Sequence, residues 1–240
     1  MIPGRAERWP ISGVDRDSED RDRHAIGLTS VSRFEVSWSL NPPRGAREYE
    51  MKSRYEFHPL TPARWGDLET LFGERGACGG CWCMYWRLPR SQFDQQKGAC
   101  NRRAFRRLVG CGRPLGILAY RDGRPIGWCA VGPRESFPVL ERSRTLARLD
   151  DRPVWSVTCL FVVRPERRRG LSVELLRAAA AHARRRGARL LEGYPVEART
   201  GRLPDAFAWT GLPAAFRRAG FVEVARRAPT RPLMRRRLAW

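Results

Sequence analysis

Runs of apolar residues along the chain predict a sheet whose strands alternate with helices. The longest run, Val154–Val163, is almost unbroken, which is typical of a central strand covered on both faces. The Asp-Gly pair within Arg121–Arg124 predicts a hairpin turn between two shorter apolar runs. Further strands are expected at 55–58, 114–120, 126–131, 190–195, 221–225 and 232–238.

Four stretches have the spacing or the end signals of helices, over 61–73, 91–109, 171–187 and 206–219. Thr61 can cap the first helix with Pro62 at its first position, and Gly211 and Pro213 break the last one early. A long loop is expected over 132–153. The order β, α, α, β, β, β, α, β, α, β, β indicates the α/β (α+β) class, with a mixed sheet flanked by helices.

Residues 1–50 differ from the rest, because a mixed-charge run leaves them little to bury. We expect this segment to be a disordered extension and 51–240 to be the folded domain; Met51 itself reads like a natural start. The first residues have no apolar segment of a secretory signal, and no apolar run approaches the roughly 20 residues of a membrane span. We therefore expect a cytoplasmic protein that does not enter a membrane.

The net charge of +21 comes from 46 basic residues, of which only Lys52 and Lys97 are lysines. The arginines are spread along the chain, so a solvated basic surface with nonspecific attraction for polyanions is favoured over a specific nucleic-acid interface. Seven cysteines are an odd number and argue against a disulfide framework. Cys129 and Cys159 lie in apolar runs and are expected in the core.

The stretch RPERRRGLSVELL, Arg164–Leu176, joins the long apolar run to a predicted helix. A strand that enters a tight turn and then a helix leaves free N–H groups at the helix start, where the helix dipole favours an anion. Gly170 allows the backbone to approach a ligand closely, and the three arginines before it can neutralise phosphate charge. The spacing is not that of a nucleotide P-loop, which ends in Gly-Lys-Ser/Thr.

This stretch resembles the Arg-x-x-Gly-x-Gly/Ala acyl-CoA loop of the GNAT superfamily of N-acetyltransferases. The element order from Tyr55 to Leu238 is similar to that of the family, and AAFRRAGF, Ala214–Phe221, resembles its aromatic-x-x-x-Gly-Phe signature. The resemblance implies a mostly antiparallel mixed sheet with helices on both faces, splayed at the fourth and fifth strands. It also implies an enzyme that transfers acetyl from acetyl-CoA to an amine of an unknown small-molecule or peptide acceptor, by direct attack.

The resemblance further implies which residues hold the coenzyme. Backbone groups of Leu160, Phe161 and Val162 would bind the pantetheine arm. The diphosphate would lie on Arg167, Arg168, Arg169, Gly170, Leu171, Ser172 and Val173. Three positions depart from the family. Ser172 replaces a Gly or Ala of the coenzyme loop and should be tolerated if its hydroxyl points outward. Phe216 replaces a tyrosine that often protonates the leaving thiolate, and Trp209-Thr210 replaces an asparagine, so the acid and base are left unassigned.

Candidates for acid–base chemistry lie elsewhere. Glu192 and Tyr194 alternate on one predicted strand and so point the same way, as a base and an acid or as an ordinary strand pair. Glu135 could contact an amine or be a solvated loop carboxylate. Asp205 is expected to be a helix cap and His182 a surface helix residue.

The loop ACGGCWCMYW has the partial zinc spacing Cys78-x-x-Cys81-x-Cys83, with Cys100 or His58 as a fourth ligand. Because aromatic residues interleave with the cysteines, an apolar lid over the acceptor pocket is favoured and no metal is assigned. The alternative to an enzyme is a non-catalytic module of the same fold that binds nucleic acid or another polyanion through its basic surface.

Overall fold

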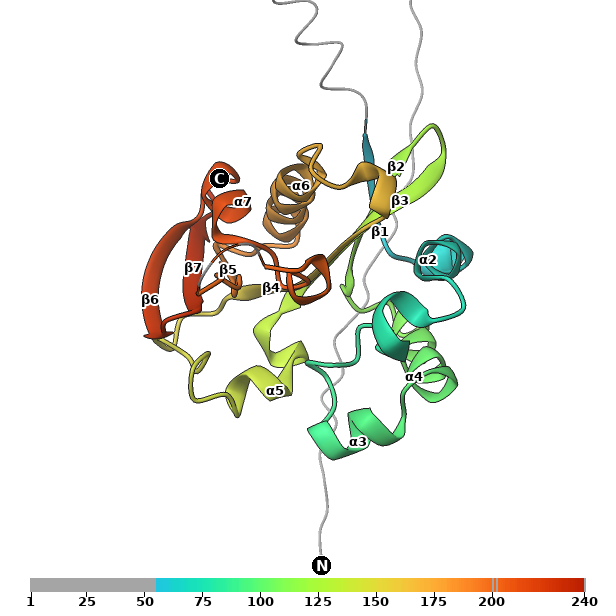
Figure 1. The fold of residues 1–240 in the computed structure, drawn as a ribbon, viewed down its shortest axis with the longest axis horizontal. Helices are drawn as coiled ribbons and strands as arrows, with labels where there is room; N and C mark the ends of the chain where they lie inside the picture. Colours follow the sequence, from blue (N-terminus) through green and yellow to red (C-terminus); the bar gives the residue numbers. More distant parts are fainter. Residues whose placement is uncertain (1–54, 200, 202, 240) are drawn as a thin grey trace, which may run out of the picture. The chain divides into compact units, whose positions relative to one another are not determined.

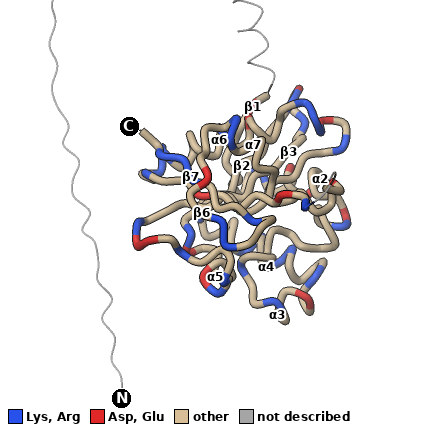
Figure 2. The backbone as a smooth tube through the Cα atoms, turned by 60° about the vertical axis from the view of Figure 1, so that its left-hand side comes forward, with Lys and Arg blue, Asp and Glu red and all other residues tan. Residues whose placement is uncertain are grey.

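The computed structural model describes residues 55–239 apart from 200 and 202. The predicted extension 1–50 lies outside the described residues, so its assignment stays a prediction. Within the described ranges, no helix is long and apolar enough to cross a membrane. Lys and Arg occur in most helices and strands with acidic residues among them (Figure 2).

The described residues form one seven-stranded sheet in the order β1-β2-β3-β4-β5-β7-β6. All neighbouring strands are antiparallel except β4 and β5, which run parallel. The long apolar run becomes β4 at the centre of this order, as predicted. The strands are β1 Glu56–Pro59, β2 Gly116–Arg121, β3 Arg124–Pro133, β4 Trp155–Val162, β5 Leu190–Gly193, β6 Val222–Ala228 and β7 Arg231–Arg237.

Helices cover both faces of the sheet, which confirms the predicted fold class (Figure 1). On one face α6 and α7 bury apolar side chains such as Leu175 and Phe216 against the sheet. On the other face α2 and α4 bury Leu68, Phe72 and Phe105. The helices are α2 Trp65–Phe72, α3 Arg90–Gln95, α4 Ala99–Gly110, α5 Pro138–Glu141, α6 Leu171–Arg185 and α7 Pro213–Arg218.

Strands β4 and β5 pair at only three positions, from Trp155↔Leu191 to Val157↔Gly193. Beyond Val157, β4 continues to Val162 while β5 ends, so the two strands separate. A register shift on the other side of β4 leaves Thr158 without a partner on β3. This bulge places Val157 in the core under α6 and Cys159 against the core under α2.

Several predicted helices have different bounds. The polar helix Ser91–Val109 is two helices, because Gly98 adopts φ 82° and donates its N–H to the Gly80 carbonyl. Thr61 makes no side-chain cap bond, and a 3-10 turn, Pro62–Arg64, precedes α2. The predicted loop 132–153 contains a 3-10 turn and α5, and the last helix begins only at Pro213.

Candidate functional site

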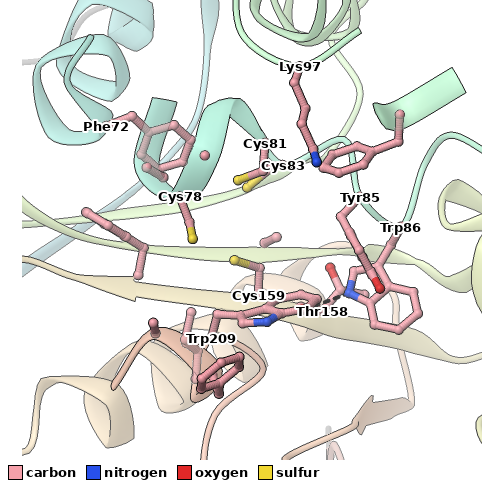
Figure 3. A pocket seen from close by; sticks show the side chains of 18 of the residues that line it. Phe72, Cys78, Cys81, Cys83, Tyr85, Trp86, Lys97, Thr158, Cys159 and Trp209 are labelled. Carbon is pink, nitrogen blue, oxygen red and sulfur yellow. Dashed lines mark hydrogen bonds between the residues drawn. The ribbon is translucent and has the colours of Figure 1, made fainter. Parts of the chain in front are cut away.

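Two cavities meet where β4 leaves β5. The first, the α6 cavity, measures about 460 Å³ and is lined by β4, the turn before α6 and the segment 205–215. The second, the thiol cavity, measures about 350 Å³ and lies on the other side of β4 (Figure 3). Both are lined by Leu160, Phe161 and Trp209, so the two cavities are adjacent at β4.

The turn before α6 presents unpaired backbone donors to the α6 cavity. Within the described part of the chain, the N–H groups of 168–172 donate no hydrogen bond to the protein. Arg168 at φ 62° and Gly170 at φ 85° adopt the left-handed conformation, which turns the chain into the helix. Glu166 also lines this cavity, but Arg121 Nη2 lies 2.6 Å from its carboxylate and offsets its charge. The helix start is therefore suited to an anion.

All residues predicted to hold the coenzyme line the α6 cavity, except Arg169 and Val173. Val173 is buried, and its N–H already donates to the Gly170 carbonyl, so this amide is not available to a ligand. Arg167 connects the end of β4 with the segment 205–215. Its Nε lies 3.0 Å from the Val162 carbonyl, and its Nη1 lies 3.2 Å from Asp205 Oδ2.

The open edge of β4 already has two protein partners. The Leu160 N–H donates to the Trp209 carbonyl at 2.7 Å. Trp86 Nε1 donates to the Thr158 carbonyl at 3.2 Å. A ligand that uses the Leu160 amide must therefore displace the Trp209 carbonyl. No sequence pattern predicts the bond between Leu160 and Trp209; the one indication is a tryptophan where the family has an asparagine.

Aromatic side chains form one wall of the thiol cavity. Tyr85 packs edge-on against Trp86 and Trp209, with ring centroids 5.1 Å apart in each pair. Arg90 and Lys97 also line the cavity, and both pair with Asp94. Among the described residues, those that line this cavity include no Asp, Glu or His.

The cysteine loop does line this cavity, with Cys78, Cys81, Cys83 and, from β4, Cys159 (Figure 3). Cys159, expected in the core, is thus half-buried at the cavity, whereas Cys129 is fully buried. Trp128 Nε1 donates to Cys83 Sγ at 2.9 Å. In the described ranges, no group of three or more His, Cys, Asp or Glu side chains is arranged to hold a metal ion.

The thiols differ in acidity. A hydrogen bond from Cys159 is the main cause that lowers the pKa of Cys83, against the opposing effect of burial. The same bond and burial raise the pKa of Cys159 well above its usual value. Burial, followed by the charge of Cys83, raises the pKa of Cys81 to about 11. Cys83 is therefore the thiol of this cluster that most readily becomes a thiolate.

Glu192 and Tyr194 do point the same way, but into a buried ionic network that lines neither cavity. Arg134, fully buried, donates from Nη1 to Glu192 Oε1 at 2.7 Å and to the Tyr194 hydroxyl at 2.6 Å. Arg235 Nε donates to the other Glu192 oxygen at 2.7 Å, and Tyr194 donates to Glu192 Oε1 at 2.6 Å. Both carboxylate oxygens are thus engaged, and the catalytic roles of these two residues stay predictions.

Burial, and then the charge of Glu192, raises the pKa of Tyr194 well above its usual value. Glu135 lies in the turn after β3, and Arg148 Nη2 is 2.8 Å from its Oε1. Partial burial is the largest single effect and raises the pKa of Glu135, but the Arg148 bond, a backbone hydrogen bond and the charges of Arg148 and Arg134 together lower it. Glu135 lines neither cavity, so its predicted contact with an amine also stays a prediction.

Two other expectations were wrong. His182 is buried rather than on the surface, and it packs edge-on against Trp155 with ring centroids 5.9 Å apart. Asp205 is not a helix cap, because Pro204 holds that position and Asp205 pairs with Arg167. Phe216, where the family has a tyrosine, is fully buried in the core under α6.

Residues 82–198 match the model of the acetyltransferase (GNAT) family. No curated protein matches the sequence significantly.

Solved structures give distant matches. A GNAT acetyltransferase from Streptococcus agalactiae is 12% identical, with a TM-score of 0.47 over 76% of this chain and 95% of that chain. The PaiA N-acetyltransferase of Thermoplasma acidophilum in complex with coenzyme A is 11% identical, with a TM-score of 0.45 over 76% and 98%. YncA of Salmonella typhimurium with acetyl-CoA is 13% identical, with a TM-score of 0.45 over 78% and 95%.

Proposed function

We propose that the chain, which matches the acetyltransferase (GNAT) family over residues 82–198, transfers acetyl from acetyl-CoA to the amine of a small molecule or peptide by direct attack. The observation that carries the proposal is the row of unpaired N–H groups at 168–172, which opens into a cavity adjacent to a second one at β4. One cavity would take the coenzyme and the other the acceptor.

The diphosphate would lie at the start of α6. Five successive amides and the helix dipole offer it hydrogen bonds and a positive potential without rearrangement of the turn. Arg167 and Arg168 line the same cavity and add positive charge. Gly170 keeps the approach open, since a Cβ at this position would meet no atom within 4 Å and the space remains available to the ligand.

The pantetheine arm would follow the open edge of β4 between the two cavities. In this position the Trp209 carbonyl gives up the Leu160 N–H, and that amide then donates to the coenzyme. The thioester would lie near Leu160 and Phe161, which line both cavities. An amine in the thiol cavity would attack the carbonyl carbon, and strand amides would stabilise the developing oxyanion.

Calorimetry with acetyl-CoA tests the coenzyme site. We expect micromolar binding by the wild type and a loss of at least about 30-fold, or roughly 2 kcal/mol, in Gly170→Glu, because the carboxylate would occupy and repel the diphosphate position. Gly187→Glu is the matched control: both glycines have φ +85°, both have no atom within 4 Å of an added Cβ, and they lie at opposite ends of α6.

Equal weakening in both variants would attribute the loss to backbone strain and contradict the assignment of the site. Absence of acetyl-CoA binding by the wild type, together with salt-sensitive DNA binding, would favour the non-catalytic polyanion-binding alternative.

An amine panel tests the transfer itself. Loss of the thioester from acetyl-CoA is followed at 232 nm with aliphatic, aromatic and peptide amines. The aromatic wall of Tyr85, Trp86 and Trp209 leads us to expect the highest rates with amines that carry a ring. Coenzyme binding with no transfer to any amine would contradict the proposed reaction.

A further inference from the structure

The proposed transfer needs a group that accepts the proton of the amine and a group that protonates the departing thiolate. Phe216 cannot donate a proton, and the described residues that line the thiol cavity include no carboxylate and no histidine. The predicted carboxylates lie outside both cavities. Arg90 and Lys97 line the cavity but pair with Asp94, and the remaining titratable groups that line it are Tyr85 and the thiols of the cysteine loop and of β4.

The surroundings of Cys83 favour the thiolate form of its side chain. Trp128 Nε1 donates to its sulfur at 2.9 Å, and Cys159 lines the same cavity from β4, where its interaction with Cys83 lowers the pKa of Cys83. Both neighbours favour the negatively charged form of Cys83 over the neutral thiol.

A buried cation next to this thiol has no carboxylate partner. Arg87 stacks over Phe137 at 4.4 Å and gives one hydrogen bond, to the Ser136 carbonyl. Its Nε and Nη2 are buried and have no hydrogen-bond partner among the described residues. Burial lowers the pKa of Arg87 to about 10, and the charge of Cys83 acts in the opposite direction. A thiolate at Cys83 therefore compensates a guanidinium that would otherwise be buried without a counter-charge.

We propose, on the basis of the function proposed above, that Cys83 and Cys159 are the acid–base pair of the acetyl transfer. A neutral amine in the thiol cavity forms the C–N bond with the acetyl carbon, and the Cys83 thiolate takes the surplus proton from its nitrogen. As the C–S bond breaks, Cys159 gives its proton to the sulfur of the coenzyme. Cys83 then passes its proton to Cys159, its neighbour in the cavity. The sum is an amine plus a thioester giving an amide plus a thiol, with both cysteines restored.

The pair is suited to this exchange because donor and acceptor are alike. A thiol and the leaving coenzyme thiolate have similar proton affinities, so transfer between them has no large barrier from mismatched pKa values. Cys159 lies on β4 next to Leu160, where the thioester is placed, whereas Cys83 faces it from the cysteine loop (Figure 3). Cys83 would therefore take the proton of the amine on one side of the acetyl group, and Cys159 would give a proton to the coenzyme sulfur on the other.

A titration of the free protein tests the thiolate without the coenzyme. Absorbance at 240 nm is recorded against pH for wild type, Cys83→Ser and Cys159→Ala. We expect the wild type minus Cys83→Ser difference to show a thiolate that forms below pH 9, the ordinary value. In Cys159→Ala the step moves to higher pH, because the S–H donor is lost. The groups that face Cys83 are Arg87, Trp128 and the thiols of Cys81, Cys129 and Cys159.

Cys111→Ser is the matched control, since Cys111 is an exposed cysteine that lines neither cavity, and it should leave the Cys83 step in place. Coincident curves for wild type and Cys83→Ser would overturn the proposal. That result would leave acetyl-CoA binding intact and the proposed function standing, so the two failures are distinguishable.

Turnover tests the catalytic role. Thioester loss is measured with the fastest amine of the panel, or with water as the acceptor where no amine reacts. Cys83→Ser and Cys159→Ala are each expected to lower the rate about 100-fold with little change in acetyl-CoA binding, and Cys111→Ser to stay within about twofold of wild type. Rates of both variants within about threefold of wild type would overturn the proposal. So would an acetyl group found on Cys83 by intact mass, since that would make the thiolate a nucleophile.

Discussion

The two ends of strand β4 present polar groups in opposite ways. At the end paired with β5, Ser156 lies beside a network in which Arg134 makes five hydrogen bonds to side chains and carbonyls. At the open end, Cys159 faces the thiol cavity together with Cys83, whose charge acts on Arg87, and two nitrogens of Arg87 have no partner among the described residues. Arg134 is fully buried and paired, whereas Arg87 is partly buried and incompletely paired.

The difference in hydrogen-bond pairing between the two ends indicates where proton transfer is expected. A network in which every polar group has a partner stabilises a fixed geometry. Removing one partner leaves a buried charge that neither the protein nor solvent compensates. An unsaturated cluster beside a cavity retains capacity to bind or to move a proton. The acid–base candidates predicted from the sequence, Glu192 and Tyr194, lie at the saturated end, and the thiols of the cavity lie at the other.

The largest effect is expected from Glu192→Ala. It would leave Arg134 and Arg235 buried without their shared carboxylate, at a cost of about 3–5 kcal/mol in the free energy of unfolding. Urea denaturation measures this loss. Glu135→Ala is the control, because its exposed ion pair with Arg148 contributes less than about 1 kcal/mol. A Glu192 variant with wild-type stability and no transfer activity would instead support its predicted role as base.

His182 packs against Trp155 at the paired end of β4, but unlike the Arg134 network it is buried with an unpaired Nε2, so it tests burial without hydrogen-bond partners. Burial and neighbouring arginines lower its pKa to about 4 from 6.5. The neutral form is therefore favoured in the folded state, and its contribution is complete above pH 6.5 and lost as pH falls through 4. The free energy of unfolding should fall by roughly 3 kcal/mol across this window.

Denaturation at pH 7 and pH 4.5 measures this effect against His182→Leu, which should not show this part of the pH dependence. Equal pH dependence of the two proteins would contradict the assigned shift.

Gly193→Ala tests the junction between the two ends. A Cβ at Gly193 would lie 2.1 Å from Phe216 Cε1, so the ring or the strand must move, at about 2 kcal/mol. The double variant with Phe216→Leu should recover part of the stability, and thermal unfolding measures both. If the double variant is as unstable as the sum of the single variants, the clash is not the cause.

The smallest effect is expected from Tyr194→Phe, which removes a hydroxyl bonded to Arg134, Ser156 and Glu192 at 2.6–2.8 Å. The loss is about 1–2 kcal/mol of stability, measured by urea denaturation, with the acetyl-transfer rate unchanged. Ser156→Ala, which touches the same hydroxyl, is the matched variant. A large fall in rate at constant stability would support Tyr194 as the acid.

The sequence predicted best what depends on local pattern. The apolar run 154–163 gave the central strand, and Asp122-Gly123 gave the hairpin, with φ 52° and 70°. His182 follows Leu175 by seven residues and Ala179 by three, so helical spacing already places it on the buried face. The polarity of the histidine side chain is therefore the misleading signal, and the helical spacing is the correct one.

The rest depends on contacts between distant segments, which no local pattern reveals. Gly98 divides a predicted helix because its N–H bonds to Gly80. Glu192 meets Arg134 across 58 positions, and Cys83 meets Trp128 across 45. Strand alternation predicts that Glu192 and Tyr194 share a face, but not that a buried guanidinium occupies it.

The unpaired Thr158 has a consequence for how the cavity could change. Side chains alternate along a strand, and the extra residue at the bulge shifts this alternation. As a result Cys159 faces the core under α2 and Leu160 faces the core under α6. Regular pairing with Thr158 opposite Ala130 would turn Leu160 toward the thiol cavity and Cys159 toward α6, whereas deletion of Thr158 would leave both side chains as they are. The lining of the thiol cavity therefore depends on one unpaired residue, because a sheet that absorbed it into the ladder would exchange a thiol for a hydrocarbon.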